Sequence, residues 1–215
     1  MKKMIIVGAG GLGRKLFVCL RRLNTNHQWD IRGFIDDNPH ALDGKKCDLP
    51  IIGGLSDWAP QEDEIFAMGV AEPSVKYKLA AMLRGKGAKF ATIVSPDVIL
   101  GDYVAFGEGS VILTPYNIES GVRIGEFVTV LGSTMALDGV IDDYATTAGF
   151  ANLTDAHVGR GAYVGSQTFL NQGITVGECA YVGVGSICLK DVAPCTQVFG
   201  TPARVIGKKE NFFND

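Results

Sequence analysis

The 215-residue sequence has few prolines, few histidines and no marked excess of charge of either sign. Its formal net charge is −3, and no run of Lys or Arg stands out, which argues against a nucleic-acid partner. No apolar run reaches the roughly 20 residues that a membrane-spanning helix needs. The opening MKKMIIVGAG is followed at once by Arg14 and Lys15, so we interpret it as a buried strand rather than a signal peptide.

The five cysteines are unevenly spaced and include no CxxC pair. This pattern predicts reduced thiols in a cytoplasmic protein and disfavours a zinc site. Proline is scarce, with 8 residues, whereas glycine is abundant, with 28. So much glycine in a chain that is 47% apolar predicts many tight turns rather than disorder.

Residues 1–90 alternate between strand and helix patterns, which predicts a small parallel sheet of the α/β, Rossmann-like class. The predicted strands are 4–7, 31–35, 65–70 and 90–94, and the predicted helices are 12–23 and 74–84. In the second helix we expect Leu79, Met82 and Leu83 to face inward.

Beyond residue 94 the apolar residues follow a six-residue period, which neither a helix nor a strand produces. The two series are Leu100, Phe106, Ile112, Ile118, Ile124, Val130 and Val158, Val164, Leu170, Val176, Val182, Cys188. This period predicts an all-β, left-handed parallel β-helix with three flat sheets and about eighteen residues per coil. Glycines beside the inward residues suit corners where a Cβ would clash or φ must be positive.

The two series are out of step with each other. From Val130 to Val158 is 28 residues, two short of five full repeats, so we expect one or two shortened corners between them. The segment is also rich in polar residues. Such an irregularity marks either a functional region or a harmless deletion.

With both halves described, the chain resembles the NeuD/PglD-type sugar acyltransferases over nearly its whole length. The matching motifs are VGAGGLGR, FIDDNP, the hexapeptide repeats and the terminal FGTPARVIG. The resemblance implies a Rossmann-like domain at residues 1–90 that holds a nucleotide sugar, and a β-helix domain at residues 91–215. It also implies a homotrimer in surface-glycan biosynthesis. Such a trimer transfers an acetyl group from acetyl-CoA, held between neighbouring β-helices, to an amine or hydroxyl of the sugar, without a metal.

Gly8, Gly10 and Gly13 form a GxGxxG motif between a strand and a helix, where backbone N–H groups and the helix dipole can hold a phosphate. A dinucleotide is the rival ligand, but about 90 residues leave no room for its second binding half. The resemblance implies that the substrate-binding residues are Gly10, Gly11, Leu12, Asp36, Asp37 and Gly69. It also implies that acetyl-CoA is contacted, largely through backbone groups, by Thr146, Ser166 and Val184. For the Asp pair, a plain turn is the alternative.

The catalytic histidine of the family is missing from this sequence. In the family it lies in a segment of the type VxEHDCVIGD, and the corresponding residues here are 135–142, with Leu137 in its place. The three histidines of the chain are His27, His40 and His157, so none lies between residues 41 and 156. Two further family histidines correspond to Leu12 and Thr146.

A hydroxyl acceptor needs a general base, which is worth about 10²–10⁴-fold in rate. A sugar amine, with a pKa of about 8, is partly neutral at pH 7 and can attack a thioester unaided. The missing histidine therefore favours an amino-sugar acceptor. Replacement proton acceptors are Asp138 and Asp142, provided that they are buried, and His157, which should lie outside the core. Solvated corner residues and a corner hydrogen bond are the alternatives.

Three hypotheses follow from these observations. The first is a CoA-dependent N-acyltransferase acting on a nucleotide-linked amino sugar, and the second is an O-acetyltransferase that uses another base. The third is a catalytically inactive trimer that binds a sugar nucleotide as a scaffold. A β-helix carbonic anhydrase would need three zinc-binding histidines, which the repeats do not contain.

Overall fold

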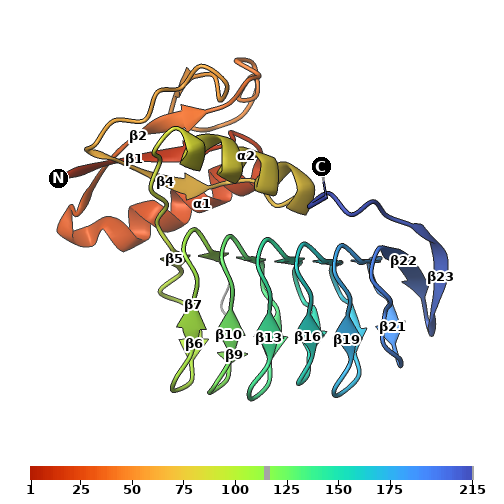
Figure 1. Ribbon diagram of the computed structural model, residues 1–215. Helices are drawn as coiled ribbons and strands as arrows, with labels where there is room; N and C mark the ends of the chain where they lie inside the picture. The colour runs from red at the N-terminus through yellow and green to blue at the C-terminus, as the bar shows by residue number, and fades with distance from the viewer. Residues whose placement is uncertain (114–116, 215) are drawn as a thin grey trace.

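The computed structural model describes residues 1–113 and 117–214 of the chain. An N-terminal α/β unit lies on one side of a β-helix, and the C-terminus returns to lie near one end of helix α2 (Figure 1). Both expected fold classes are confirmed. Within the described residues, no helix is both long and apolar enough to cross a membrane.

The N-terminal unit is built on a four-stranded parallel sheet in the order β3-β2-β1-β4. Its strands are β1 (Lys2–Val7), β2 (Trp29–Ile35), β3 (Ile51–Gly53) and β4 (Glu64–Met68). The central strand β1 has neighbours on both edges, and its last four residues are buried because both faces of the sheet are covered. Strand β3 was not expected from the sequence, since three residues are too few to give a periodicity.

Two helices flank this sheet, and their positions agree with the predictions. They are α1 (Gly11–Leu23), which is followed by the short 3-10 helix η1 (Asn24–Asn26), and α2 (Pro73–Gly85). The inward face of α2 differs from the expectation: Leu83 is fully buried, whereas Leu79 and Met82 are only half-buried. Lys76 and Ala80 are buried instead, because α2 packs against the β-helix as well as the sheet.

The expected strand at 90–94 is divided between the two parts of the molecule. Phe90 forms an isolated bridge with Phe66 of β4. The next strand, β5 (Ile93–Val94), pairs instead with β8 of the β-helix. Val111 of β8 lies in the same buried cluster as Leu16 of α1, so the two parts share apolar packing.

The β-helix consists of two-residue strands that repeat on three sheets of eight, six and five strands, and the eight-stranded sheet ends in two longer strands, β22 and β23, which are antiparallel to each other. The eight-stranded sheet contains β5, β8 (Val111–Ile112), β11 (Thr129–Val130), β14 (Thr146–Thr147), β17 (Tyr163–Val164), β20 (Tyr181–Val182), β22 (Thr196–Gly200) and β23 (Ala203–Lys208). The six-stranded sheet contains β6 (Ile99–Leu100), β9 (Asn117–Ile118), β12 (Thr134–Met135), β15 (Asn152–Leu153), β18 (Phe169–Leu170) and β21 (Ile187–Cys188). The five-stranded sheet contains β7 (Ala105–Phe106), β10 (Arg123–Ile124), β13 (Val140–Ile141), β16 (His157–Val158) and β19 (Thr175–Val176).

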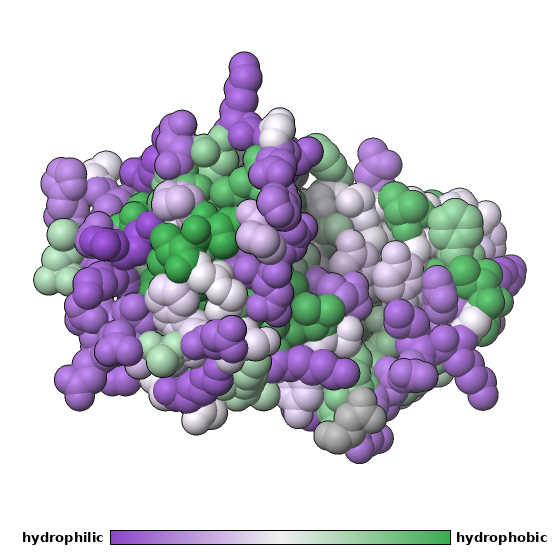
Figure 2. Space-filling model, turned by 90° about the horizontal axis from the view of Figure 1, so that it is seen from above, coloured by the Kyte–Doolittle hydropathy of each residue, from purple (hydrophilic) through white to green (hydrophobic). Residues whose placement is uncertain are grey.

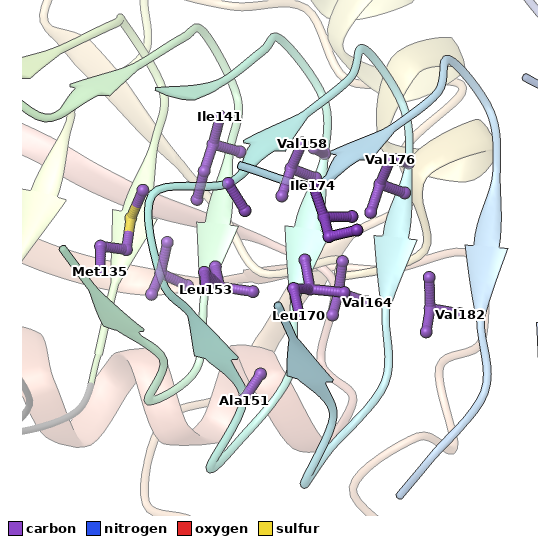
Figure 3. Packing of buried hydrophobic residues seen from close by; sticks show 14 of the residues in the cluster. Met135, Ile141, Ala151, Leu153, Val158, Val164, Leu170, Ile174, Val176 and Val182 are labelled. Carbon is purple, nitrogen blue, oxygen red and sulfur yellow. The ribbon is translucent and has the colours of Figure 1, made fainter. Parts of the chain in front are cut away.

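In each strand the second residue points into the coil and the first points outward. Inward residues of successive coils stack into a continuous apolar core, as Ile141, Val158 and Val176 do in Figure 3. The predicted series is confirmed from Ile112 onward. Leu100 is an exception, since it lies in the first coil and its side chain is 43% exposed.

The irregular middle contains two shortened corners, as the residue count predicted. Successive inward residues are Val130, Met135, Ile141, Thr147, Leu153 and Val158, so the first and last steps are each one residue short. Strands of successive coils therefore pair at a spacing of 17 residues here instead of 18.

Glycines at the corners are required by close packing between coils. A Cβ on Gly165 would lie 2.7 Å from the backbone nitrogen of Val184, and one on Gly125 would lie 2.7 Å from that of Asp143. Neither residue has a positive φ. Of the two reasons that the sequence suggests, the steric one applies at these positions.

Candidate functional site

The glycine loop follows β1 and opens the first turn of α1. Gly8 has a φ of +89°, and Gly10 precedes the helix in an extended conformation without a side-chain cap. A Cβ on Gly10 or Gly11 would meet nothing within 4 Å, so the approach to the helix N-terminus is open. A Cβ on Gly13 would lie 1.9 Å from the Gly8 carbonyl oxygen, so this glycine is needed for packing. Unpaired N–H groups of the first helical turn can therefore bind an anion here.

Two aspartates hold the loops beside this helix start. Asp36 accepts hydrogen bonds from Ala9 N at 2.7 Å and from Asn38 N at 2.9 Å. Asp37 accepts a hydrogen bond from Leu55 N at 2.7 Å. Both carboxylates thus have a structural role, in agreement with the turn alternative, and their contact with a nucleotide stays a prediction.

Gly69 and Leu12 complete the expected substrate-binding set. Gly69 follows β4, donates its N–H to the Val7 carbonyl at 2.8 Å, and leaves no room for a Cβ, which would lie 2.8 Å from Gly13 Cα. Leu12 is half-buried in the first turn of α1. All six predicted positions therefore lie at the carboxyl edge of the sheet, where open α/β sheets bind their ligands.

A cavity of about 390 Å³, here called the edge pocket, lies between the start of α2, the β-helix and the C-terminal tail. Pro73 and Ser74 line it from α2, and Lys209 lines it from the tail. Tyr163 and Tyr181 form the β-helix wall, with their rings stacked 5.0 Å apart at 7°. The face seen in Figure 2 is hollowed where the N-terminal unit meets the uncovered coils of the β-helix.

The C-terminal tail is fastened to the β-helix beside the edge pocket. Asn211 donates a hydrogen bond to Glu178 Oε1 at 2.5 Å, and the Arg160 guanidinium lies 3.6 Å from the centre of the Phe213 ring.

Cys179 also lines the edge pocket, and burial raises the pKa of its thiol to about 11. This thiol is therefore protonated at neutral pH and does not act as a nucleophile.

A second cavity of about 690 Å³, here called the dyad pocket, lies on the outer face of the five-stranded sheet. It contains His157 and Asp142, whose Nε2 and Oδ2 atoms are 2.7 Å apart. The His157 side chain is 49% exposed and that of Asp142 is 41% exposed, so Asp142 lacks the full burial on which its role as a proton acceptor was conditional. Arg123 and Arg160 flank the pair. The Asp142 carboxylate fixes the orientation of the His157 ring through Nε2. The other ring nitrogen, Nδ1, points away from Asp142.

The third expected proton acceptor does not join this pair. Asp138 lies in the corner between β12 and β13 with a φ of +57°; it is exposed and does not line the dyad pocket. It therefore does not meet the condition of burial and agrees with the alternative of a solvated corner residue. Leu137, at the position of the family histidine, is 56% exposed in the same corner.

The three positions expected to contact acetyl-CoA have different surroundings. Ser166 and Val184 occupy the same corner in successive coils, where Val184 is 56% exposed and Ser166 half-buried. Thr146 is fully buried beneath α2 and donates a hydrogen bond from Oγ1 to the Ala71 carbonyl at 2.5 Å. Ser166 and Val184 are thus accessible at this corner, whereas the Thr146 side chain faces α2.

The residue that holds Thr146 in place was not singled out from the sequence. Lys76 of α2 is fully buried, and its Nζ donates to Thr129 Oγ1 at 3.0 Å, Thr146 Oγ1 at 2.9 Å and the Ala145 carbonyl at 3.1 Å. Burial holds the pKa of Lys76 well below its usual value. The spacing of Lys76 to Ala80 and Leu83, at i, i+4 and i+7, is the signal that places it on the buried face. Among the described residues, no group of three His, Cys, Asp or Glu side chains is arranged to hold a metal ion.

Comparison with known proteins supports both halves of this architecture. Residues 3–83 match the family model of the PglD N-terminal domain. The acetyltransferase domain of PglB from Neisseria gonorrhoeae FA1090 is 22% identical with a TM-score of 0.86, covering 96% of this chain and 100% of that one. WeeI from Acinetobacter baumannii AYE is 27% identical with a TM-score of 0.76, covering 96% and 100%.

A mutant of perosamine N-acetyltransferase from Caulobacter crescentus, solved with CoA and GDP-perosamine, is 19% identical with a TM-score of 0.84, covering 97% and 98%. Curated relatives match shorter segments. Serine acetyltransferase 3 of Arabidopsis thaliana is 46% identical over 54 residues, which are 25% of this chain and 14% of that protein. Galactoside O-acetyltransferase of Escherichia coli is 35% identical over 63 residues, which are 27% and 31%. This chain therefore spans less than a third of the length of these two relatives.

The domain model, the order of the two parts and the complete overlap with the PglB domain agree with the motifs in the sequence. The chain resembles the NeuD/PglD-type hexapeptide-repeat acyltransferases over nearly its whole length, and residues 3–83 match their N-terminal domain.

Proposed function

We propose that this protein transfers an acyl group, by default acetyl, from acyl-CoA to the amine of a nucleotide-linked sugar in surface-glycan biosynthesis. The observation that carries the proposal is the position of the edge pocket. This pocket is lined by the start of α2, which follows the carboxyl end of β4 in the chain, and by the β-helix. A ligand whose phosphates sit on the glycine loop can therefore extend its sugar toward the β-helix.

The residues around the edge fit a phosphate-bearing ligand. The open first turn of α1 offers unpaired N–H groups, and Lys78, Lys208 and Lys209 line the neighbouring pocket. The stacked tyrosines offer an apolar wall with hydroxyl groups, which suits a sugar ring. Gly10, Gly11, Leu12, Asp36, Asp37 and Gly69 are the substrate-binding residues in this proposal.

We also propose that the active form is a homotrimer with the six-stranded sheet at its centre. None of the six described outward residues of this sheet carries a charge; they are Ile99, Asn117, Thr134, Asn152, Phe169 and Ile187. Ile99 is 65% exposed and Phe169 39% exposed, which favours burial against another copy. Acetyl-CoA then lies in the groove between copies, over Ser166 and Val184, with Thr146 contributing through its backbone.

The division of the chain near residue 90 and a cytoplasmic location belong to the same proposal. The match of the family model to residues 3–83 supports the division. All five cysteines are unpaired, which suits a reducing compartment.

In the reaction, the amine lone pair attacks the thioester carbonyl, the new C–N bond forms and the CoA thiolate leaves. The perosamine N-acetyltransferase from Caulobacter crescentus, solved with CoA and GDP-perosamine, has the same fold and a name that specifies an amine acceptor. The absence of a histidine at Leu137 favours an amine as well. Backbone N–H groups of the corners and the proximity of the two substrates supply most of the rate.

A thiol-release assay with acetyl-CoA tests the proposal. The acceptors are UDP-, GDP- and dTDP-linked 3-amino and 4-amino sugars, each paired with its hydroxyl counterpart. We expect CoA release with an amino sugar only. Release with the hydroxyl sugars would favour O-acetylation. An absence of release with every acceptor, together with no CoA binding in calorimetry, would support the inactive scaffold.

The glycine loop has a matched pair of variants for this assay. Gly10→Asp puts a carboxylate at the N-cap, where it stabilises α1 by about 1 kcal/mol but repels a phosphate. Gly10→Asn has the same size without the charge. We expect Gly10→Asp to raise the KM for the nucleotide sugar by about 10-fold or more relative to Gly10→Asn, with the KM for acetyl-CoA unchanged. Equal KM values in the two variants would contradict phosphate binding at this loop.

A further inference from the structure

We infer that His157, oriented by Asp142, is the proton acceptor for acyl transfer, and that it serves a sugar held by the N-terminal unit of a neighbouring copy. This inference rests on the proposed function and adds the group that removes the proton. It begins with the geometry of the pair. Asp142 binds Nε2 of His157 at 2.7 Å, which leaves Nδ1 free to accept a proton. Both side chains are partly exposed in an open cavity, so a substrate can reach them.

The pair does not face the edge pocket of its own copy. The two cavities lie on opposite sides of one corner of the β-helix. Gly161 and Cys179 line the edge pocket, whereas the preceding residues Arg160 and Glu178 line the dyad pocket. The Phe213 ring, stacked on Arg160, lies on this corner between the two cavities. A sugar in the edge pocket is thus separated from His157 of the same chain.

A threefold arrangement brings the two cavities together. The three sheets form a triangular prism, and the uncharged six-stranded sheet is the face that suits the threefold axis. Each five-stranded sheet then lies across a groove from the eight-stranded sheet of the next copy. His157 of β16 and Tyr163 of β17 belong to the same coil, so they lie at the same height along the axis. The dyad pocket of one copy therefore faces the edge pocket of the next copy.

A neutral amine attacks without a base, but its nitrogen must still lose a proton before the amide is complete, and a positioned base speeds this loss. Attack by the neutral amine on the thioester gives a tetrahedral intermediate with a proton to lose from nitrogen. His157 Nδ1 takes this proton as the C–N bond is completed, and the Asp142 carboxylate stabilises the imidazolium. The C–S bond breaks, the CoA thiolate leaves with the electron pair, and the imidazolium returns the proton to it. The exposed Leu137 side chain cannot perform this step.

Substitution of His157 is the first test. We expect His157→Gln to lower kcat by about 100-fold, in the range of a lost general base, with the KM of both substrates and CoA binding retained. His40→Gln is the matched control, because it removes a different exposed histidine that pairs with Asp43 at 3.0 Å. We expect its kcat to equal that of the wild type. An unchanged kcat in His157→Gln, in a protein that does release CoA, would overturn the inference and leave the proposed function standing.

Asp142 is a positioning residue, and its variants separate this role from general stabilisation. The amide of Asp142→Asn can donate a hydrogen bond to Nε2, which favours the tautomer with the ring proton on Nδ1 and so removes the base. We expect kcat to fall by about 10-fold or more without a change in Tm, and Asp142→Glu to restore part of it. A fall in Tm that parallels the fall in kcat in both variants would indicate a structural role instead.

Mixed oligomers test whether the base acts between copies. Gly10→Asp weakens the sugar site and His157→Gln removes the base, so at a sugar concentration well below the wild-type KM each variant alone keeps only about a tenth of the wild-type activity or less. When differently tagged copies of the two are co-expressed and purified as mixed trimers, about one site in three combines a wild-type loop with a wild-type histidine from the neighbour. We expect about a third of the wild-type activity. Mixed trimers no more active than either variant alone, or a fully active monomer in light scattering, would overturn action between copies.

Discussion

The two parts of the molecule use parallel strands in different ways. In the N-terminal sheet, partners are distant and unevenly spaced along the chain: Lys3 pairs with Glu64, and Met4 pairs with Ile31. In the β-helix, each strand pairs with one a single coil away, as Thr146 pairs with Tyr163. The N-terminal sheet therefore depends on a few close approaches between remote segments, whereas the β-helix depends on repeated local stacking. Predictions about stability can separate the two.

The largest effect is expected for Gly13→Ala in the N-terminal unit. Its Cβ would lie 1.9 Å from the Gly8 carbonyl oxygen, so the backbone must move. We expect a loss of about 4 kcal/mol in the free energy of unfolding, the size typical of severe backbone or packing clashes. Both tryptophans, Trp29 and Trp58, lie in this unit, so their fluorescence reports its unfolding.

The control for this variant is Gly11→Ala, at a position open on all sides. Alanine in the first helical turn should leave stability unchanged or raise it by about 0.5 kcal/mol. If Gly13→Ala unfolds no earlier than Gly11→Ala in urea, then the close approach between helix and strand does not limit the stability of this unit.

A smaller effect is expected for Leu170→Ala in the β-helix. Leu170 is fully buried, so its truncation leaves a cavity and should cost about 3 kcal/mol. Leu100→Ala makes the same change in the first coil, where the side chain is 43% exposed, and should cost less than about 1 kcal/mol. Urea unfolding followed by far-UV circular dichroism measures both. Equal losses of unfolding free energy in the two variants would mean that side chains pack no more tightly in the middle coils than in the exposed first coil.

The smallest effect is expected at Lys76, where the two parts meet. Because burial lowers the pKa of Lys76, the folded protein loses this proton at a lower pH than the unfolded chain does. As the pH rises from the folded pKa toward the ordinary value of 10.5, the unfolded state binds more protons, and the folded state gains stability. The slope is about 1.4 kcal/mol per pH unit.

Lys76→Met provides the comparison, because it keeps the length of the side chain and removes its titration. Urea unfolding at a series of pH values should show the wild type gaining stability relative to this variant as the pH rises. The thiols of Cys179 and Cys188, whose burial raises the pKa of each to about 11, contribute equally to both proteins. Parallel curves for the two proteins would contradict a lowered lysine pKa.

The fold was largely predictable from the sequence, because its signals are local or repeated. The six-residue period predicted the inward residues from Ile112 onward, and the residue count between Val130 and Val158 predicted the shortened corners. The glycine motif predicted the loop before α1. Two elements did not follow: β3 is too short for a pattern, and residues 90–94 read as one apolar strand although their pairing partners differ.

The candidate site was predictable in part. The sequence singled out Asp138, Asp142 and His157 separately, and only the coil geometry brings Asp142 to His157 and leaves Asp138 apart. Lys76 was not singled out from the sequence. Its helical spacing places it on the buried face of α2, but the sequence does not show which distant groups its ammonium group contacts. Residues that point outward from the coils follow no apolar pattern in the sequence. Their contacts are therefore known only once the folded structure shows which coils and helices lie side by side.

By itself, the sequence determined the architecture: a glycine loop entering a helix, and a six-residue repeat that buries one apolar side chain per step. These features are fixed by steric limits and by the hydrophobic effect, both of which act through residues close together in the chain or spaced at a constant period. The tertiary structure decided the chemistry. It joined His157 to Asp142 across one coil, buried Lys76 under a neighbouring sheet and opened the edge pocket beside Tyr163. Such contacts join segments whose separation no local rule sets, so only the folded chain determines them.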